Sequence, residues 1–382
     1  MARSYLDHNA TAPVRPEVVD ACARALSLGN PSSVHAEGRA ARAAVEAARA
    51  QVAAFVGAEP KNVIFTSGGT EANNLALSPA LRRTGGPPPT RLLVGGTEHA
   101  SVLDGHRFPA NAAEPIPVDG DGVVDLAWLE ARLRDGPALA SIQVANSETG
   151  VIQPVAAAAA LVRAAGGLLH ADAVQAAGRI PLDIAALGAD LVTLSAHKLG
   201  GPKGVGALVV ASDAILLDRL VRGGGQERGQ RGGTENISGI VGFGAAAQAA
   251  GAAVAAEGAR LRALRDACEA AVRRLAPAAV VFGEGAERLS NTLCFAVPGV
   301  KAETALIAFD LAGVAVSSGS ACSSGKVGRS HVLAAMGVPP ALAEGAIRVS
   351  FGWSSAEEDV ARFAAAFEKL LAALYVRRAD AA

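Results

Sequence analysis

Residues 191–210 read LVTLSAHKLGGPKGVGALVV, an apolar run followed by a lysine and a glycine-rich turn. The run at residues 191–195 predicts a buried strand, and residues 207–210 predict a second strand after the turn. Lys198 therefore lies at the carboxyl end of a strand, with His197 before it. A lysine in isolation is more often a solvated surface residue. Beside glycines, which let a backbone approach a flat ring closely, Lys198 is a candidate for forming an imine with an aldehyde cofactor.

Outward from this stretch, short apolar strands alternate with helices through the first two thirds of the chain. We expect further strands at residues 63–66, 91–94, 139–145 and 168–171, and helices at residues 71–82 and 155–165. Alternation at this spacing predicts a mainly parallel sheet wrapped by helices, and ligands of such folds bind at the carboxyl ends of the strands.

Near residue 251 the pattern changes to that of a smaller α+β unit. We expect helices at residues 252–275 and 357–375, with short strands at residues 280–282, 292–296 and 314–316 between them. The predicted domains are a large one over residues 16–251 and a small one over residues 1–15 and 252–382. The uncharged stretch at residues 237–256 is mostly alanine and glycine, which favours a buried helix over a membrane span.

Composition narrows the functional classes. The 382 residues are 51% hydrophobic and carry 35 basic against 36 acidic side chains, so nothing suggests a nucleic-acid-binding surface or an acidic tail. The first ten residues, MARSYLDHNA, lack an apolar segment of signal-peptide length, and the expected compartment is the cytosol. The cysteines are Cys22, Cys268, Cys294 and Cys322. They form no C-x-x-C pair or metal-ligand cluster, so we expect neither disulfides nor a metal site.

Two polar residues follow the predicted strand at residues 168–171, within the sequence HADAVQ. Asp172 has two interpretations: it caps the next helix, or it pairs with a protonated pyridine nitrogen and keeps that ring an electron sink. Gln175, three residues on, is placed to hydrogen-bond a hydroxyl on the same ring.

The sequence TSGGTEANN at residues 66–74 follows another predicted strand and opens a helix. Glycines and a hydroxyl at a helix N-terminus form an anion site, because free N–H groups and the helix dipole point there. An ordinary helix capped by threonine and glutamate is the alternative. Beside Lys198 and Asp172 on other strand ends, the motif predicts a phosphate site at Gly69 and Thr70.

Three further features also suggest residues of a site at this edge of the sheet, but each is a weaker indication. His99 follows the strand at residues 91–94, and an imidazole there could stack on a ring and move protons. Arg348 lies in an apolar segment and needs an anionic partner, either a structural carboxylate or the carboxylate of an amino acid. The glycine-rich loop at residues 223–236 predicts either a site-lining or subunit-contact segment or a plain surface loop.

Cys322 lies in the sequence SSGSACSSG at residues 317–325. Small and hydroxylated residues with glycine do not form a packed element easily, so we expect an exposed loop. A thiol on such a loop could act as a nucleophile in its thiolate form. The alternative is a turn of small residues with an incidental cysteine.

Together these motifs resemble the cysteine desulfurases, in the class V branch of the fold-type-I pyridoxal-phosphate enzymes. The resemblance extends from YLDHNAT at residues 5–11 to RVSFGW at residues 348–353, and includes GNPSSVH at residues 29–35, SGGTEANN at residues 67–74, SAHK at residues 195–198 and SSGSAC at residues 317–322. These motifs in this order are highly specific. The resemblance implies an α/β fold-type-I transferase, with a large domain on a mainly parallel seven-stranded sheet and a smaller α+β domain.

The resemblance also implies roles for single residues. Pyridoxal 5'-phosphate would form its imine with Lys198, its ring nitrogen would pair with Asp172, its ring hydroxyl would bind Gln175, and His99 would stack over the ring. The cofactor phosphate would be held by Gly69, Thr70, Ser195 and His197, and by Thr234 from the partner subunit of a homodimer. The substrate would be held by Asn9 and Arg348. Cys322 would receive the sulfur as a persulfide.

The chain departs from the family pattern in two places. In the motif Asn146-Ser147-Glu148-Thr149-Gly150, Ser147 replaces an asparagine that is expected to touch the cofactor. We keep Ser147 as a cofactor residue, since its hydroxyl can donate one hydrogen bond, with a shorter reach. His8 and Ala12 replace the more usual asparagine and threonine near the implied substrate entry.

The implied reaction converts L-cysteine to L-alanine and transfers the sulfur to Cys322, for delivery to an acceptor such as an iron–sulfur scaffold protein or a tRNA-thiolation pathway. No nucleic-acid or membrane binding is expected. A selenocysteine lyase and a class V aminotransferase are the enzymatic alternatives, and the thiol loop argues against the aminotransferase. A non-catalytic scaffold is a third alternative, but a degenerate relative is expected to lose the lysine or the thiol.

Overall fold

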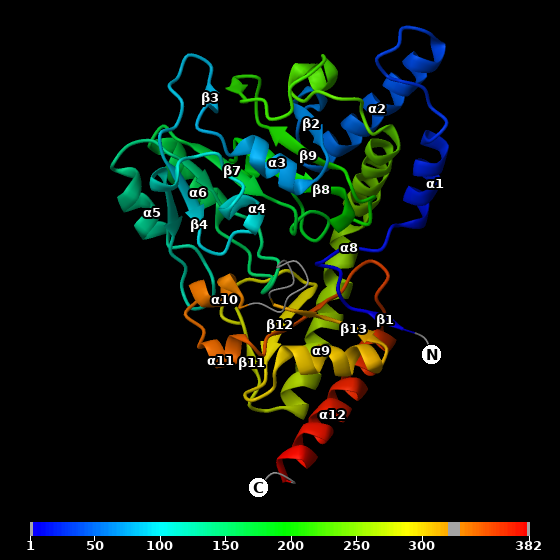
Figure 1. Cartoon of the computed structure of the whole chain (residues 1–382), viewed down its shortest axis with the longest axis vertical. Coiled ribbons are helices and arrows are strands. Elements are labelled where there is room, and N and C mark those ends of the chain that lie inside the picture. The colour runs from blue at the N-terminus through cyan, green and yellow to red at the C-terminus, as the bar shows by residue number, and fades with distance from the viewer. Residues whose placement is uncertain (1–2, 320–328, 380–382) are drawn as a thin grey trace.

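The computed structural model describes residues 3–319 and 329–379. Figure 1 shows two lobes joined by one long helix. The larger lobe holds the sheet, with strands in the order β2 (Val63–Thr66), β9 (Gly206–Val210), β8 (Leu191–Ser195), β7 (Leu168–Asp172), β6 (Leu139–Ser141), β4 (Leu92–Gly95) and β5 (Ala113–Ile116). Only β9 runs antiparallel to its neighbours β2 and β8. The predicted seven-stranded, mainly parallel sheet is therefore confirmed.

Helices cover both faces of this sheet, and buried apolar side chains fill the layers between. The helices are α1 (Pro16–Ala25), α2 (Ala36–Phe55), α3 (Gly69–Ala76), α4 (Ala100–Leu103), α5 (Leu126–Leu133), α6 (Val155–Ala164) and α7 (Ile184–Leu187), with short 3-10 turns η1 (Pro60–Asn62), η2 (Ala110–Ala112), η3 (Ala196–Lys198) and η4 (Gln226–Gly229). A small antiparallel pair, β3 (Arg82–Arg83) with β10 (Ile215–Leu216), lies beside the sheet.

The helix expected at residues 71–82 was predicted too long. It ends at Ala76, because Pro79 forces the residue before it away from helical geometry and cannot donate a backbone hydrogen bond. The strand β5 was not predicted at all. Its sequence AEPI contains a glutamate and a proline, and both are uncommon in strands.

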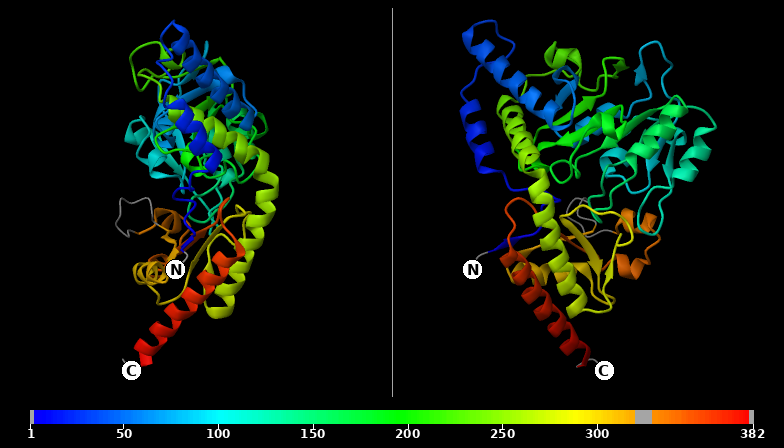
Figure 2. Two further views of the ribbon diagram at one scale, coloured as in Figure 1. Left: turned by 90° about the vertical axis from the view of Figure 1, so that its right-hand side faces the viewer. Right: turned by 180° about the vertical axis from the view of Figure 1, so that it is seen from behind.

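The long helix is α8 (Ile237–Leu275). It joins the two lobes in one continuous element, as Figure 2 shows from behind. Its first half packs against α1 and α2 through Ile240, Phe243 and Ala247, and its second half buries Leu261 and Cys268 in the core of the smaller lobe. By length and composition α8 could also cross a membrane. The helices expected at residues 237–256 and 252–275 are thus one helix, and the domain boundary placed at residue 251 stays a prediction.

The smaller lobe is built on an antiparallel sheet of β11 (Val280–Val281), β12 (Thr292–Ala296), β15 (Ile347–Ser350) and β14 (Ser317–Ser318). The N-terminal strand β1 (Ser4–Tyr5) pairs with β13 (Val314–Ala315). Helices α9 (Ala302–Leu311), α10 (His331–Ala335), α11 (Pro340–Ala343) and α12 (Glu357–Ala379) surround these strands. Four fully buried rings form the core, namely Phe295, Phe309, Phe363 and Phe367. Truncating one such ring costs about 3–5 kcal/mol, so this cluster fixes how α9 and α12 pack.

Candidate active site

A cavity of about 190 Å³ lies at the carboxyl ends of the parallel strands, where the larger lobe faces the smaller one. It is lined by most of the predicted cofactor residues: Gly69, Thr70, His99, Ser147, Asp172, Gln175, Ser195, His197 and Lys198. They come from separate strand ends, loops and the start of α3. The topology of the sheet thus brings together residues as far apart in the sequence as Gly69 and Lys198.

Asp172 ends strand β7 and lies on the floor of the cavity, only 7% exposed. Its Oδ1 accepts a hydrogen bond from the backbone N–H of Val174 at 2.9 Å, and its Oδ2 accepts from Asn73 Nδ2 at 2.8 Å. The residues after Asp172 form a turn rather than a helix. The helix-cap interpretation is therefore wrong, and the carboxylate is held rigidly where it can meet a ring nitrogen.

A chain of hydrogen bonds connects Asp172 to His99. Asn73 Nδ2 also donates to Ser101 Oγ at 2.8 Å, and Ser101 Oγ lies 2.8 Å from His99 Nδ1. The backbone N–H of Ser101 donates to the same Nδ1 at 3.1 Å. Because Nδ1 accepts this bond, a neutral His99 carries its proton on Nε2. Ser101 thus sets both the ring orientation and the tautomer of His99.

Lys198 closes the opposite side of the cavity from the η3 turn. Its Nζ donates to the backbone carbonyls of Asn9 and, at 2.9 Å, Ala10. His197, the residue before it, is neutral at pH 7, since burial and the adjacent Lys198 lower its pKa to about 4. The N-terminal segment therefore positions the lysine through backbone atoms.

The start of α3 supplies the anion-binding end. Its N-cap, Gly68, makes no side-chain cap, so the helix amides at Gly69 and Thr70 are not covered by a capping side chain. A Cβ at Gly206 would lie 2.6 Å from the backbone carbon of Gly68, so the strand beside this turn needs glycine. Of the alternative, a helix capped by threonine and glutamate, the glutamate part is present, since Glu71 accepts from the backbone N–H of Ser67 at 2.8 Å.

These groups fit pyridoxal phosphate as a set. The cavity offers a carboxylate for a ring nitrogen at Asp172, an amine for an aldehyde at Lys198, and helix amides with hydroxyls for a phosphate at Thr70 and Ser195. Ala145 and Val174 add apolar surface of the kind that a flat ring packs against. Glu98 is fully buried near the site, and burial and the nearby Asp172 raise its pKa well above the ordinary value.

The two predicted substrate residues, Asn9 and Arg348, do not line the cavity. Arg348 is 1% exposed; its Nη2 bonds Asp7 at 2.8 Å and its Nη1 donates to the carbonyl of Ser147 at 3.0 Å. The structure therefore contains the structural ion pair that the sequence left open. Asn9 is buried and donates through Nδ2 to Thr292 at 2.9 Å and to the carbonyl of Ser147. Their roles toward a substrate stay predictions.

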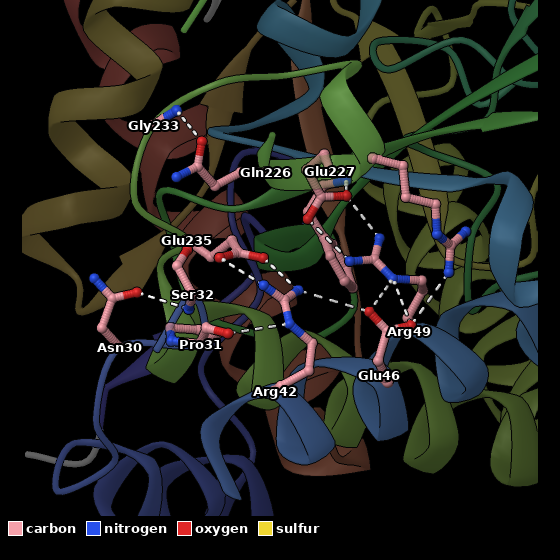
Figure 3. Close-up of polar contacts among 12 residues, drawn as sticks. Asn30, Pro31, Ser32, Arg42, Glu46, Arg49, Gln226, Glu227, Gly233 and Glu235 are labelled. Atoms are coloured by element: carbon pink, nitrogen blue, oxygen red, sulfur yellow. Dashed lines mark hydrogen bonds and ion pairs between the residues drawn. The ribbon is translucent and has the colours of Figure 1, made fainter. Parts of the chain in front are cut away.

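Thr234 does not line the cavity of its own chain. It is exposed in the glycine-rich loop, which ion pairs hold against α2, as Figure 3 shows. Arg49 and Glu227 form a fully buried pair at 2.6 Å, and Arg42 bonds Glu235 at 2.7 Å. Glu227 adopts a left-handed backbone with a φ of 47°, a strained conformation that the buried pair stabilises. Despite its glycines, this loop has a defined shape and presents Thr234 outward.

Cys322 lies outside the described residues, so its predicted role is not tested. The described residues on either side of residues 320–328 both approach Glu148. Ser330 Oγ donates to Glu148 Oε2 at 2.6 Å, and a Cβ at Gly319 would lie 3.0 Å from the same oxygen. Ser330 also caps α10 by accepting from the N–H of Leu333. Glu148 therefore ties the chain next to the cysteine segment to the rim of the cavity.

Glu148→Gln should remove a pH-dependent part of the stability. Burial raises the pKa of Glu148 from its ordinary value of 4.5 to about 7. Because the folded carboxyl keeps its proton to higher pH than the unfolded one, the wild-type free energy of unfolding should fall as pH rises from about 4.5 to about 7, by on the order of 3 kcal/mol. Glutamine does not titrate, so the variant lacks this fall.

The measurement is urea unfolding of both proteins at about pH 5 and about pH 8. His8 and His197 have lowered pKa values and make stability rise with pH, but both proteins contain them. The difference between the proteins therefore isolates Glu148. An identical pH dependence in wild type and Glu148→Gln would contradict the assignment.

Several site residues were not predicted from the sequence. Asn73 and Ser101 each lie in a quoted motif, but the sequence gives no sign that one bridges Asp172 and the other His99. Gln143 lines the cavity from the end of β6, and its Nε2 bonds the carbonyl of Thr97 at 2.8 Å. Gln143 is a polar residue inside the apolar run predicted as a strand at residues 139–145, and that interruption was the available signal.

Known proteins match this architecture over nearly its whole length. The chain matches the aminotransferase class-V family over residues 4–363. A cysteine desulfurase of Cereibacter sphaeroides is 43% identical over 366 residues, which are 94% of this chain and 93% of that protein. A cysteine desulfurase of Frankia sp. (strain EuIK1) is 42% identical over 372 residues, 93% of this chain and 88% of that one. The solved NifS-like protein from Rickettsia africae ESF-5 has a TM-score of 0.87 at 34% identity, covering 97% of this chain and 99% of its own. This chain therefore belongs to the class-V aminotransferase family, in which it groups with the cysteine desulfurases.

Proposed function

We propose that this protein converts L-cysteine to L-alanine with pyridoxal phosphate and carries the released sulfur on Cys322. The supporting observation is the single cavity in which Lys198, Asp172 and the start of α3 converge. An amine, a carboxylate and an anion site at these places match one aromatic aldehyde phosphate. The family relatives make the desulfurase reaction the best use of this arrangement.

When bound, the cofactor supplies an aldehyde for the substrate amine and a ring that accepts electrons from the substrate. Asp172 keeps the ring nitrogen protonated, and Thr70, Ser195 and His197 hold the phosphate. With the cofactor bound, the amine of Lys198 would be the group that moves a proton at the substrate α-carbon. These residues thus bind, orient and exchange protons from fixed positions on strand ends.

Sulfur transfer falls to the thiolate of Cys322. Attack on the substrate sulfur forms a sulfur–sulfur bond and breaks the carbon–sulfur bond, whose electron pair stays with the carbon skeleton. Protonation of that skeleton yields alanine, so the step needs no external oxidant. The persulfide then passes to an acceptor thiol by exchange chemistry.

The direct test measures alanine and sulfide from L-cysteine with dithiothreitol, together with the absorption spectrum of the protein. Equal amounts of alanine and sulfide are expected, with a visible absorbance band from the bound cofactor. Selenocysteine in place of cysteine tests the lyase alternative: a much higher alanine yield from selenocysteine would favour it. A colourless protein that makes no alanine would overturn the proposal.

We further propose a cytosolic homodimer in which each Thr234 reaches the cofactor phosphate of the partner subunit. The exposed position of Thr234, on a loop held firmly by buried ion pairs, supports this role. The sulfur acceptor is proposed to be an iron–sulfur scaffold protein or a component of tRNA thiolation. Acceptors of either kind need only a reactive thiol to receive the sulfur.

Mixing two impaired variants, at a cofactor concentration too low to load Thr234→Ala, tests the shared site. Thr234→Ala should bind the cofactor about 10–100-fold more weakly, the usual cost of one hydrogen bond to a charged group. Lys198→Ala should lack turnover. In a mixed dimer, the site with an intact Lys198 faces an intact Thr234, so equal mixing should restore up to about a quarter of wild-type activity. No gain on mixing would show that Thr234 does not act across the dimer.

A further inference from the structure

Arg179 is a buried cation without a carboxylate partner among the described residues. It is 7% exposed, yet it takes part in none of the ion pairs that the described chain forms. Burial and the nearby Arg348 lower its pKa to about 9, so it remains charged at pH 7. A buried charge that lacks a counter-ion is costly, and such a charge is retained where it does something other than stabilise the fold.

The bonds of Arg179 go to Gln175 and the N-terminal segment. Nη1 donates to Gln175 Oε1 at 2.6 Å and to the Gln175 carbonyl, and Nη2 donates to the carbonyl of His8 at 3.3 Å. On its other side, Gln175 Nε2 donates to the carbonyl of Asn9 at 3.0 Å. The amide of Gln175 is therefore held between a cation and a carbonyl.

This arrangement determines which atom of Gln175 faces which way. A guanidinium only donates hydrogen bonds, so the atom facing Arg179 must be the amide oxygen. A carbonyl only accepts, so the atom facing Asn9 must be the amide nitrogen. With its oxygen turned toward Arg179, Gln175 has the second N–H of its amide nitrogen to offer the cavity. Without Arg179, the bond to the Asn9 carbonyl alone would hold the amide in this orientation, and nothing would hold its oxygen.

We propose that Arg179 is a positioning residue that fixes Gln175 as a hydrogen-bond donor to the ring oxygen of the cofactor and adds positive charge behind it. Arg179 does not line the cofactor cavity, so it acts through Gln175. It lines a separate small cavity of about 30 Å³ on the far side of Lys198, together with His8. The inference rests on the proposed placement of Gln175 beside the cofactor ring.

The charges around Gln175 support this polarity. Asp172 and Lys198 lie in the cavity with it, and the charge of Arg348 contributes to lowering the pKa of Arg179. Arg348 is neutralised by Asp7 at 2.8 Å, so Arg179 is the unneutralised cation on that side. A donor and a cation both favour the ionised ring oxygen, and they therefore disfavour a proton on the neighbouring imine nitrogen.

The test compares the pH midpoint of the cofactor's visible absorption change among purified, cofactor-loaded proteins. Arg179→Met removes the charge and the donors, and should raise the midpoint by about one unit or more. Arg179→Lys keeps the charge with a less rigid donor and should shift the midpoint less. Gln175→Glu keeps an oxygen for Arg179 but presents the cavity with an acceptor, and should also raise the midpoint.

Arg265→Met is the matched control. Arg265 is equally buried at 7% and bonds the carbonyl of Leu289 at 3.0 Å, but it lies in α8, away from the cofactor cavity. Its loss should leave the midpoint at the wild-type value. A folded Arg179→Met or Gln175→Glu protein with the wild-type midpoint would overturn the inference.

Cofactor affinity supplies a second readout that does not need turnover. Arg179→Met should bind pyridoxal phosphate more weakly than wild type, and Arg179→Lys should restore part of the affinity. If Arg179→Met does not fold, the Gln175→Glu and Arg179→Lys proteins still decide the question. Wild-type protein that shows no absorbance with the cofactor would instead refute the proposed function, so the two failures are distinguishable.

Discussion

Cys322→Ala should lower sulfide release from L-cysteine by about 10³-fold or more, while the visible absorbance of the bound cofactor stays unchanged. The described part of the chain supports this expectation, because two of the other cysteines are unsuited to act as the nucleophile. Burial raises the pKa of Cys268 and Cys294 far above the ordinary thiol value, so neither forms a thiolate. Both also lie inside the apolar cores of the smaller lobe, where substrate cannot reach them.

Cys22 is the matched control for this variant. Its Sγ packs between α1 and α8, so close that a Cβ at Gly242 would lie 2.4 Å away, and burial raises its pKa. Cys22→Ala should keep wild-type sulfide release. The assay measures alanine and sulfide together, because loss of sulfide alone would point to a defect in the second transfer. Sulfide release near the wild-type rate from Cys322→Ala would rule out this cysteine as the sulfur carrier.

The sheet and most of the cavity were predictable because strand ends carry a local signal. A polar residue directly after an apolar run marks the carboxyl end of a strand, and parallel strands bring those ends to one edge. Asp172, Ser195 and Lys198 were found in this way and lie around one cavity. Strand β5 gave no such signal, because its place at the sheet edge tolerates a proline that a central strand would not.

Contacts between distant segments were not predictable. The pairing of Arg348 with Asp7 joins residues 341 positions apart, and the sequence around either residue does not indicate that the other is its partner. Arg179 follows Gln175 at a spacing of four residues, which from sequence alone resembles an arginine on the surface of a helix. Only the fold shows that this segment is a buried turn, and that its arginine orients an amide rather than meeting solvent.

The structure of one chain does not test the role predicted for Thr234. Thr234 is exposed and does not line the cavity of its own chain, so the role proposed for it would need a second copy. The sequence pattern that singled out its loop, a run of glycines with two arginines, suggested flexibility. The ion pair between Arg231 and Glu71, 2.8 Å long, instead ties the loop to α3, the helix that begins at the proposed phosphate site. Charge spacing across 160 residues carries no signal of this pairing.

Lys198→Ala should lower turnover of L-cysteine by about 10⁴-fold or more, since it removes both the amine that holds the cofactor and the group that moves the proton at the α-carbon. Lys198 is the only lysine among the described residues that line the cavity, so no neighbour replaces it. The variant should also lose the absorbance band of the lysine-bound cofactor. Treatment with sodium borohydride should attach the cofactor covalently to the wild-type protein. The variant, treated in the same way, should lose its cofactor on denaturation.

Lys203→Ala separates this effect from a general loss of charge near the site. Lys203 lies five residues further along the same glycine-rich turn and is exposed. It contributes positive charge near His197, as Lys198 does, but does not line the cavity. Lys203→Ala should therefore keep turnover and borohydride fixation.

Because Lys198 also donates to the carbonyl of Ala10, loss of the Lys198 side chain should reduce the free energy of unfolding by about 1 kcal/mol, too little to unfold the protein. A folded Lys198→Ala protein that still turned over cysteine at more than about a hundredth of the wild-type rate would place the essential amine elsewhere.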